Sequence, residues 1–339
     1  QAKMEAQVTG STIDATKNVE VSAVNSSEIE ALSGGIAGAG AYAIGAGVSL
    51  NEIDSSLSTS VTGSQITSGR DVSVTASNEA NIKSVAVGGV GAASFALGGG
   101  VATNEIQNDM DANITGSTID TARHVEVSAE NTSEIHTLSG GVAISAGNAV
   151  GAGVSLNEIE SNMRACVVDS QVTSGGDVSV STSNVSIIEA LAIGGAGAGT
   201  FALGASVSVN RIGGVICSCI MDDSDVIAAG NISVTTFDAS QIHAVAPGLA
   251  GAGAVAVGVS VVDNDINRTL KAVVADSDVN AGDHVMVDVT SRSGHHAIAV
   301  GGAIGGDVAV VGSSSSNRLT QITDAAVDGE SSVVAGSDV

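Results

Sequence analysis

The sequence predicts an all-β fold, a repetitive parallel β-solenoid with repeats of about 53 residues and a Gly/Ala-rich packed layer. Three observations predict it: motifs that recur at a fixed period, valines that alternate with polar residues, and a lack of large side chains. Aromatic residues form 1% of the chain, while glycine occurs 44 times and proline once. Small side chains fill an interior only where backbone layers lie close together, as in thin stacked sheets.

The strictest motif is an asparagine that recurs once in every repeat, followed two residues later by Ile or Leu. The steps between successive copies are 53, 53, 53, 54 and 53 residues. Asparagines that lie one coil apart, at about 4.8 Å, can form a continuous hydrogen-bonded ladder. We therefore predict a structural ladder, not a ligand set, formed by Asn51, Asn104, Asn157, Asn210, Asn264 and Asn317.

A Gly-Ser or Asp-Ser turn motif recurs at the same steps and sets the repeat boundaries. We expect residues 1–339 to form one repeat domain with copies at about 10–62, 63–115, 116–168, 169–222, 223–275 and 276–328. Partial repeats stand at both ends, so we expect further coils or end-to-end association with copies of the same chain. The sequence leaves open whether a repeat forms one coil or two, and the single asparagine per repeat favours one.

A longer period is also present. Residues 11–53 match 117–159 at 28 of 43 positions, but match the neighbouring copy, 64–106, at only 17. The duplicated unit is therefore a pair of repeats, 106 residues long.

The secondary structure is expected to be β throughout. Segments such as Asp71 to Thr75 place valine on one face and polar residues on the other, and turn residues precede them. We expect four or five short strands in each repeat. The uncharged Gly/Ala-rich runs at 31–50, 84–103 and 190–209 predict a central layer that is covered on both faces.

The net charge of −25 argues against nucleic-acid binding and against attraction to anionic lipid. We interpret the acidity as a solvated, self-repelling surface. The three cysteines do not form a zinc pattern. The fourth step of 54 residues contains one extra residue. If the extra residue follows Cys219, then Cys219 lies one repeat above Cys166. At this position we favour an inert thiol over a disulfide.

Two motifs resemble a known family. The turn-strand from Gly175 to Val180 and the run from Gly45 to Asn51, repeated from Gly151 to Asn157, resemble the repeats of giant filamentous haemagglutinin-like and leukotoxin-type adhesins. This resemblance implies a right-handed β-helical shaft that is secreted to the cell surface, without catalytic residues. We therefore expect a structural shaft of an extracellular or cell-surface filament or adhesin, which could meet a host or neighbouring cell surface.

Three alternatives remain open. The first is a β-helical polysaccharide-acting enzyme or binding module, for which Asp222, Asp223 and Asp225, or Asp263 and Asp265, would supply carboxylates. We expect no enzyme, because aromatic walls for a sugar are nearly absent. The second is a membrane-associated Gly/Ala repeat protein, which the weakly hydrophobic composition disfavours. The third is calcium at the acidic turns, which Asp223 and Asp225 or Asp276 and Asp278 could bind weakly; we expect solvated aspartates and no cofactor.

Overall fold

The computed structural model describes residues 2–338 and shows a parallel β-solenoid, which confirms the predicted fold class. Among these residues no helix is long and apolar enough to cross a membrane. Each of the first five full coils contains two strands of 21 residues and one strand of four residues, and three parallel sheets result. In the sixth coil the sheet C strand is divided into two shorter strands of seven and 12 residues.

The strands of each sheet follow one another at intervals of one coil. Sheet A contains β1 (Ala2–Thr9), β4 (Tyr42–Thr62), β7 (Phe95–Thr115), β10 (Asn148–Val168), β13 (Phe201–Met221), β16 (Val255–Ala275) and β20 (Val308–Asp328). Sheet B contains β2 (Thr12–Ala15), β5 (Gln65–Ser68), β8 (Thr118–Thr121), β11 (Gln171–Ser174), β14 (Asp225–Ala228), β17 (Asp278–Ala281) and β21 (Ser332–Ala335). Sheet C contains β3 (Val19–Ala39), β6 (Val72–Ala92), β9 (Val125–Ser145), β12 (Val178–Ala198), β15 (Ile232–Ala252), β18 (Val285–Ser291) and β19 (Gly294–Gly305).

The register shows that one repeat forms one broad coil. Asn51 pairs with Asn104, and Val72 pairs with Val125, so equivalent residues of successive repeats are direct neighbours across the sheet. The expectation of four or five short strands per repeat is wrong. The alternation of inward and outward residues continues through the Gly/Ala runs. One long strand therefore covers a stretch that the sequence analysis divided into several short strands.

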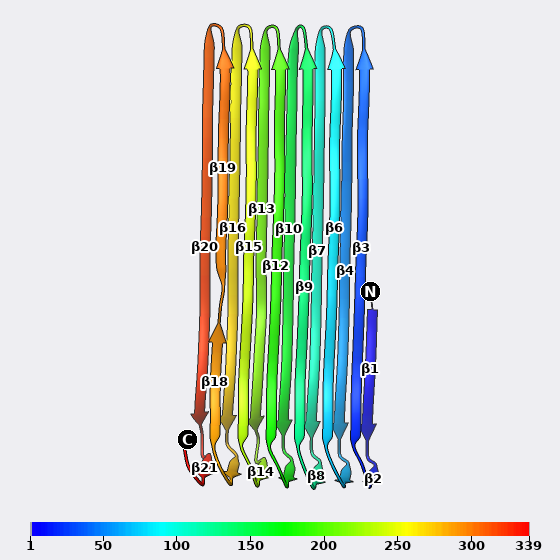
Figure 1. Ribbon diagram of the computed structural model, residues 1–339, viewed down its shortest axis with the longest axis vertical. Helices are drawn as coiled ribbons and strands as arrows, with labels where there is room; N and C mark the ends of the chain where they lie inside the picture. The colour runs from blue at the N-terminus through cyan, green and yellow to red at the C-terminus, as the bar shows by residue number, and fades with distance from the viewer. Residues whose placement is uncertain (1, 339) are drawn as a thin grey trace.

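The molecule is a thin slab whose longest dimension lies along the strands and not along the stacking direction (Figure 1). A strand of 21 residues spans about 70 Å at about 3.3 Å per residue. Tight turns join sheets C and A at one end of the slab, and the short strands of sheet B close the other end.

The large apolar side chains gather near sheet B, where three sheets enclose a wider space. Leu57, Val61, Ile66 and Val74 belong to this cluster and are almost fully buried. A second row of isoleucines follows towards the middle of the slab, formed by Ile53, Ile106, Ile159, Ile212 and Ile266 from sheet A and by Ile82, Ile135, Ile188 and Ile242 from sheet C. These columns explain why Ile or Leu follows each ladder asparagine.

The Gly/Ala runs bring the two long sheets into backbone contact. A Cβ atom added at Gly35 would lie 2.5 Å from the carbonyl oxygen of Ala46, and one at Gly98 would lie 2.5 Å from that of Val142. Only glycine fits such a close approach. The expectation that both faces are covered is wrong within one chain, because the outward side chains of Ile144 and Leu249 are 64% and 50% exposed.

The turn between sheets A and B requires a left-handed residue. Gly10, Gly63 and Gly116 hold this position with φ of 57° to 58°, and Asp169 and Asp276 hold it with φ of 47° and 46°. Aspartate tolerates this conformation better than most other side chains. Between coils four and five the extra residue is accommodated by two consecutive left-handed aspartates, which are Asp222 and Asp223.

Candidate functional site

The six predicted asparagines lie in one column inside sheet A. The Nδ2 of each of the first five donates a hydrogen bond to the Oδ1 of the next asparagine at 2.7 to 3.0 Å, in the order Asn51, Asn104, Asn157, Asn210, Asn264 and Asn317. Three of them also donate to a serine two residues earlier in the same strand. The amides are thus paired along the stacking axis, which is a structural arrangement and leaves little capacity for a ligand.

Sheet C contains a second buried ladder that our sequence analysis missed. Asn25, Asn78, Asn131 and Asn184 donate in succession at 2.7 to 2.8 Å, and the last of them donates to Asp238 Oδ1. The signal was available, because these residues recur at the same steps of 53 and 54 residues. The change from amide to carboxylate in the fifth coil marks an irregular place.

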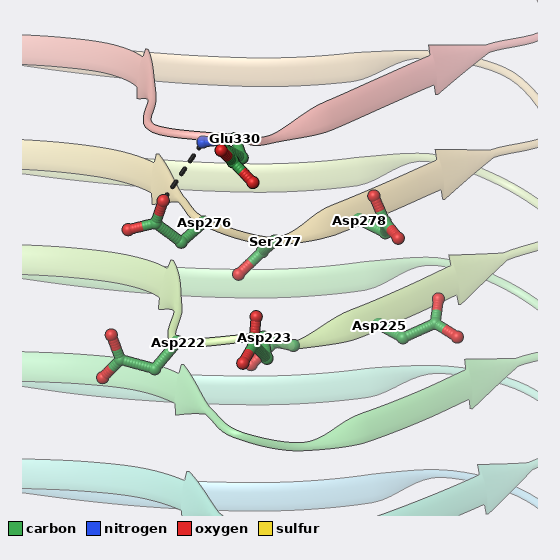
Figure 2. A pocket seen from close by; sticks show the side chains of 8 residues that line it. Asp222, Asp223, Asp225, Asp276, Ser277, Asp278 and Glu330 are labelled. Carbon is green, nitrogen blue, oxygen red and sulfur yellow. Dashed lines mark hydrogen bonds between the residues drawn. The ribbon is translucent and has the colours of Figure 1, made fainter.

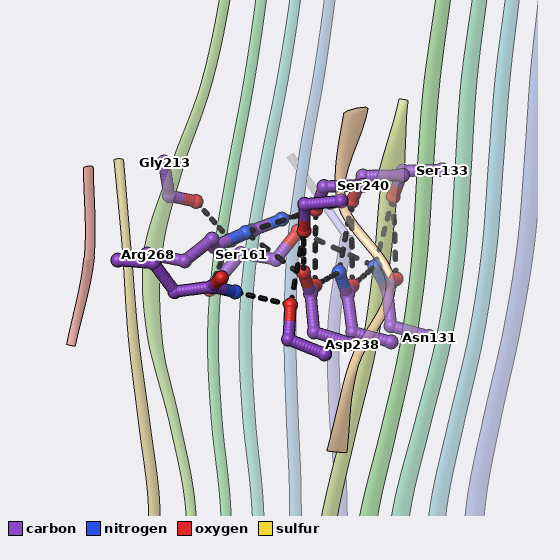
Figure 3. A network of polar contacts seen from close by, with 12 residues as sticks. Asn131, Ser133, Ser161, Gly213, Asp238, Ser240 and Arg268 are labelled. Atoms are coloured by element: carbon purple, nitrogen blue, oxygen red, sulfur yellow. Dashed lines mark hydrogen bonds and ion pairs between the residues drawn. The ribbon is translucent and has the colours of Figure 1, made fainter. Parts of the chain in front are cut away.

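A buried arginine occupies that place (Figure 3). The Arg268 side chain is fully buried, and its Nε lies 3.6 Å from Asp238 Oδ1. Its guanidinium donates to Ser240 Oγ at 3.3 Å and to Ser186 Oγ at 2.9 Å. Burial lowers the pKa of the Arg268 guanidinium, and the nearby Asp238 carboxylate opposes that shift.

The arginine fits because the neighbouring coil has no side chain at the equivalent position. Gly214 pairs with Arg268 and has a φ of 123°, which favours glycine. The guanidinium Nη1 reaches past this glycine to the carbonyl oxygens of Gly213 and, at 3.2 Å, of Ser161 in the coil beyond. One side chain therefore contacts three successive coils.

The acidic turn residues considered for calcium, and three of those considered for catalysis, line an open cleft along the turns that begin coils five and six (Figure 2). Asp222, Asp223, Asp225, Asp276, Asp278 and Glu330 line it, together with Ser224 and Ser277. Asp276 Oδ1 already accepts a hydrogen bond from the backbone N–H of Glu330 at 3.1 Å. Asp263 and Asp265 lie elsewhere, on the outer face of β16.

The serines of the turn motif also form a column between coils. The backbone N–H of Ser64 donates to Ser117 Oγ, and that of Ser117 donates to Ser170 Oγ, each at 3.1 Å. The side chains of Ser64 and Ser117 return a bond to the carbonyl two residues earlier. Each serine side chain thus accepts a hydrogen bond from the backbone N–H of the serine in the preceding coil, which gives the recurrent Gly-Ser motif a structural role.

The cysteines lie together on sheet A, where Cys166 and Cys219 are fully buried and Cys217 is half-buried. Cys166 and Cys219 pair in register and form a disulfide between coils three and four, so our preference for a free thiol at Cys219 is wrong. The extra residue follows Met221, which preserves this register. Cys217 is free, and burial raises the pKa of its thiol against the opposing effects of Arg164 and Lys271. Two of the three sulfur atoms are thus bonded to each other and one thiol remains.

In one outward column of sheet C, two basic side chains contact acidic side chains of neighbouring coils. Lys83 Nζ lies 3.1 Å from Glu30 Oε1, and His136 Nδ1 lies 3.0 Å from Glu189 Oε2 in the next pair of coils. These pairs are exposed and contribute little to stability. They do reduce repulsion between stacked acids.

Comparison of the chain with protein families, with curated proteins and with solved structures finds no match.

Proposed function

We propose that the chain is a coil-stacking segment of the structural shaft of an extracellular or cell-surface filament or adhesin, with a mechanical and assembly role. The observation that carries this proposal is the pair of buried amide ladders, in sheets A and C, which link successive coils. Together with the parallel backbone pairing, they resist separation of the coils along the stacking axis.

Two further observations support the extracellular assignment. A disulfide links neighbouring coils through Cys166 and Cys219, and disulfides persist mainly in oxidising compartments such as the cell exterior. The surface is strongly acidic, with a net charge of −25, which keeps such particles apart from one another and from nucleic acid.

The test is electron cryo-microscopy of the protein in its native preparation. We expect ribbons about 70 Å wide that show a spacing of about 4.8 Å along their length, because coils stack at the strand separation of a sheet. Discrete particles that cleave or bind a soluble polysaccharide at the acidic cleft would overturn the proposal in favour of the β-helical enzyme or binding module. Binding of the native material to lipid vesicles would favour the membrane-associated alternative.

A further inference from the structure

The outer face of sheet C is apolar near the tight turns, and its side chains form a regular pattern. Two adjacent columns of outward residues define what we call the checkerboard face. The first column contains Gly34, Val87, Gly140, Ile193, Pro247 and Val300. The second contains Ile36, Gly89, Val142, Gly195, Leu249 and Gly302.

Bulky residues and glycines alternate along both columns, in opposite phase. In odd-numbered coils the second column carries the branched side chain, and in even-numbered coils the first column carries it, with Pro247 as the one departure. The alternation follows from the 106-residue period of the sequence. Each glycine forms a depression beside the branched side chain of its neighbour, as Gly195 does beside Val142.

Some of these depressions join into an apolar groove on the surface of sheet C. Val142 and Ile144 form one wall of an apolar groove, Leu249 lies on the opposite side, and Gly195 and Gly197 lie on the strand between them. The exposed fractions of Val142 and Leu249 are 47% and 50%, so these side chains stand clear of their own sheet. Bulky knobs beside empty holes are the geometry that allows two sheets to interdigitate.

We propose that this face pairs with the same face of a second copy of the chain, side by side, about a two-fold axis parallel to the stacking direction. Such an axis, placed between the two columns, exchanges them while keeping every residue at the level of its own coil. Ile36 of one copy then lies opposite Gly34 of the second copy. Val142 likewise lies opposite Gly140 of the second copy.

Branched residues also lie opposite glycines in the even-numbered coils, where the first column carries the branched side chain. In the even-numbered coils Val87 lies opposite Gly89 of the second copy, and Ile193 lies opposite Gly195 of the second copy. A branched residue meets a glycine in five of the six coils; the exception places Leu249 against Pro247. A surface that is complementary to itself under a two-fold operation is what a symmetric dimer requires.

The flanking columns extend the complementarity. The same axis places Leu32 opposite Gly38 of the second copy, and Leu191 opposite Gly197 of the second copy. In the third and sixth coils two bulky residues face each other, Leu138 opposite Ile144 and Ile298 opposite Ile304, so the fit there is tighter. The four columns contain no charged or polar residue, in a chain with 36 acidic residues. The face is therefore free of the like-charge repulsion that separates the rest of two such surfaces.

The size of the face suits a stable dimer. One outward residue covers about 30 Å² of a sheet, because it takes two residues along the strand and one strand separation across it. Four columns over six coils thus cover roughly 800 Å² on each copy, which equals the contribution of one partner to a standard interface. The outer face of sheet A is also apolar near the tight turns, but it lacks this alternation of bulky residues and glycines. One of its columns carries valine in five of the six coils, as Val48, Val101, Val154, Val207 and Val261.

The experiment replaces two glycines of the checkerboard face, Gly89 and Gly195, by valine. A Cβ added at Gly195 would meet no atom closer than Val142 Cγ2 at 3.5 Å, and one at Gly89 would meet only Ile36 Cγ1 at 3.9 Å. Both sites therefore accept a side chain within one chain. Gly99 lies on the outer face of sheet A with nothing within 4 Å, which makes Gly99→Val the matched control. Sedimentation velocity over a concentration series gives the dimer dissociation constant, and circular dichroism reports folding.

We expect the wild-type chain and Gly99→Val to form dimers with the same dissociation constant. Gly89→Val/Gly195→Val should weaken dimerisation by about 100-fold or more, since each added side chain overpacks the interface twice by symmetry. A folded wild-type chain that stays monomeric at about 100 µM would overturn the proposal. The proposal would also be overturned if Gly99→Val weakened dimerisation as much as the double variant does. Loss of the dimer when phosphatidylcholine vesicles are added would overturn it too, and would assign the face to lipid. Side-by-side pairing is independent of end-to-end stacking, so either result leaves the proposed shaft function to its own test.

Discussion

Arg268 Nε lies 3.6 Å from Asp238 Oδ1 with both side chains fully buried, and this ion pair interrupts the asparagine ladder of sheet C. Asp238 is a full member of that ladder, because its Oδ1 accepts from Asn184 at 2.7 Å. Its Oδ2 accepts from Ser293 at 2.9 Å. The pair thus replaces an amide–amide contact by a charged one at the single place where Gly214 leaves room for a long side chain.

Breaking this pair from either side is expected to be costly. Arg268→Met leaves a buried carboxylate, and Asp238→Asn leaves a buried guanidinium, so each should lower the free energy of unfolding by about 3–5 kcal/mol. The double variant restores an uncharged ladder and should recover about 2 kcal/mol relative to the sum of the single changes. Urea unfolding of the four proteins measures the coupling, and strict additivity would show that the two side chains do not interact.

The asparagine ladder of sheet A offers a test with an internal control. Asn264→Ala removes the acceptor for Asn210 and the donor for Asn317. It should cost about 1–3 kcal/mol, because Asn210 is fully buried and its amide is left without this acceptor. Asn267 stands on the same strand but is exposed on the outer face. Asn267→Ala should therefore change the free energy of unfolding by less than about 0.5 kcal/mol. Equal effects at the two positions would mean that the ladder contributes nothing beyond helping the strand to form.

The parts of this fold that can be predicted from the sequence are those that repeat. The sheet A asparagines are visible because the same residue returns in every coil. The sheet C asparagines return in only the first four coils, and our sequence analysis missed them. Arg268 is different, since it occurs once and contacts Ser161, which is 107 residues away. Its role depends on the register that places Gly214 beside it. The outward alternation of Ile36 and Gly89 also needed the register, because it only becomes a pattern when coils are stacked.

The left-handed turn position predicts a difference between two substitutions at one site. Asp169 has a φ of 47°, where Gly116 stands in the preceding coil. Asp169→Gly and Asp169→Ala both remove the charge, but only glycine adopts this conformation without strain. We expect the glycine variant to be more stable than the alanine variant by about 1–2 kcal/mol. Thermal or urea unfolding of the pair measures this difference, and equal stabilities would show that the turn relaxes.

His295 predicts a dependence of stability on pH. It pairs with Ile242 and so faces inward in the isoleucine row, where both of its ring nitrogens are shielded from solvent. Burial lowers the pKa of His295 below its ordinary value of 6.5. The unfolded chain therefore takes up the proton first, so this contribution to stability is fully present above pH 6.5 and is lost as the pH falls towards the folded pKa.

Replacement of this histidine by the residue of its own column isolates the effect. His295→Ile restores the isoleucine row and should reduce the loss of stability between about pH 7.5 and pH 5, which urea unfolding at each pH measures. The matched control is His296→Gln, since His296 is the next residue on the strand and faces outward. That control should keep the pH dependence of the wild-type chain. If His295→Ile loses as much stability on acidification as the wild type, protonation of carboxylates alone accounts for the acid sensitivity and the buried imidazole has no part in it.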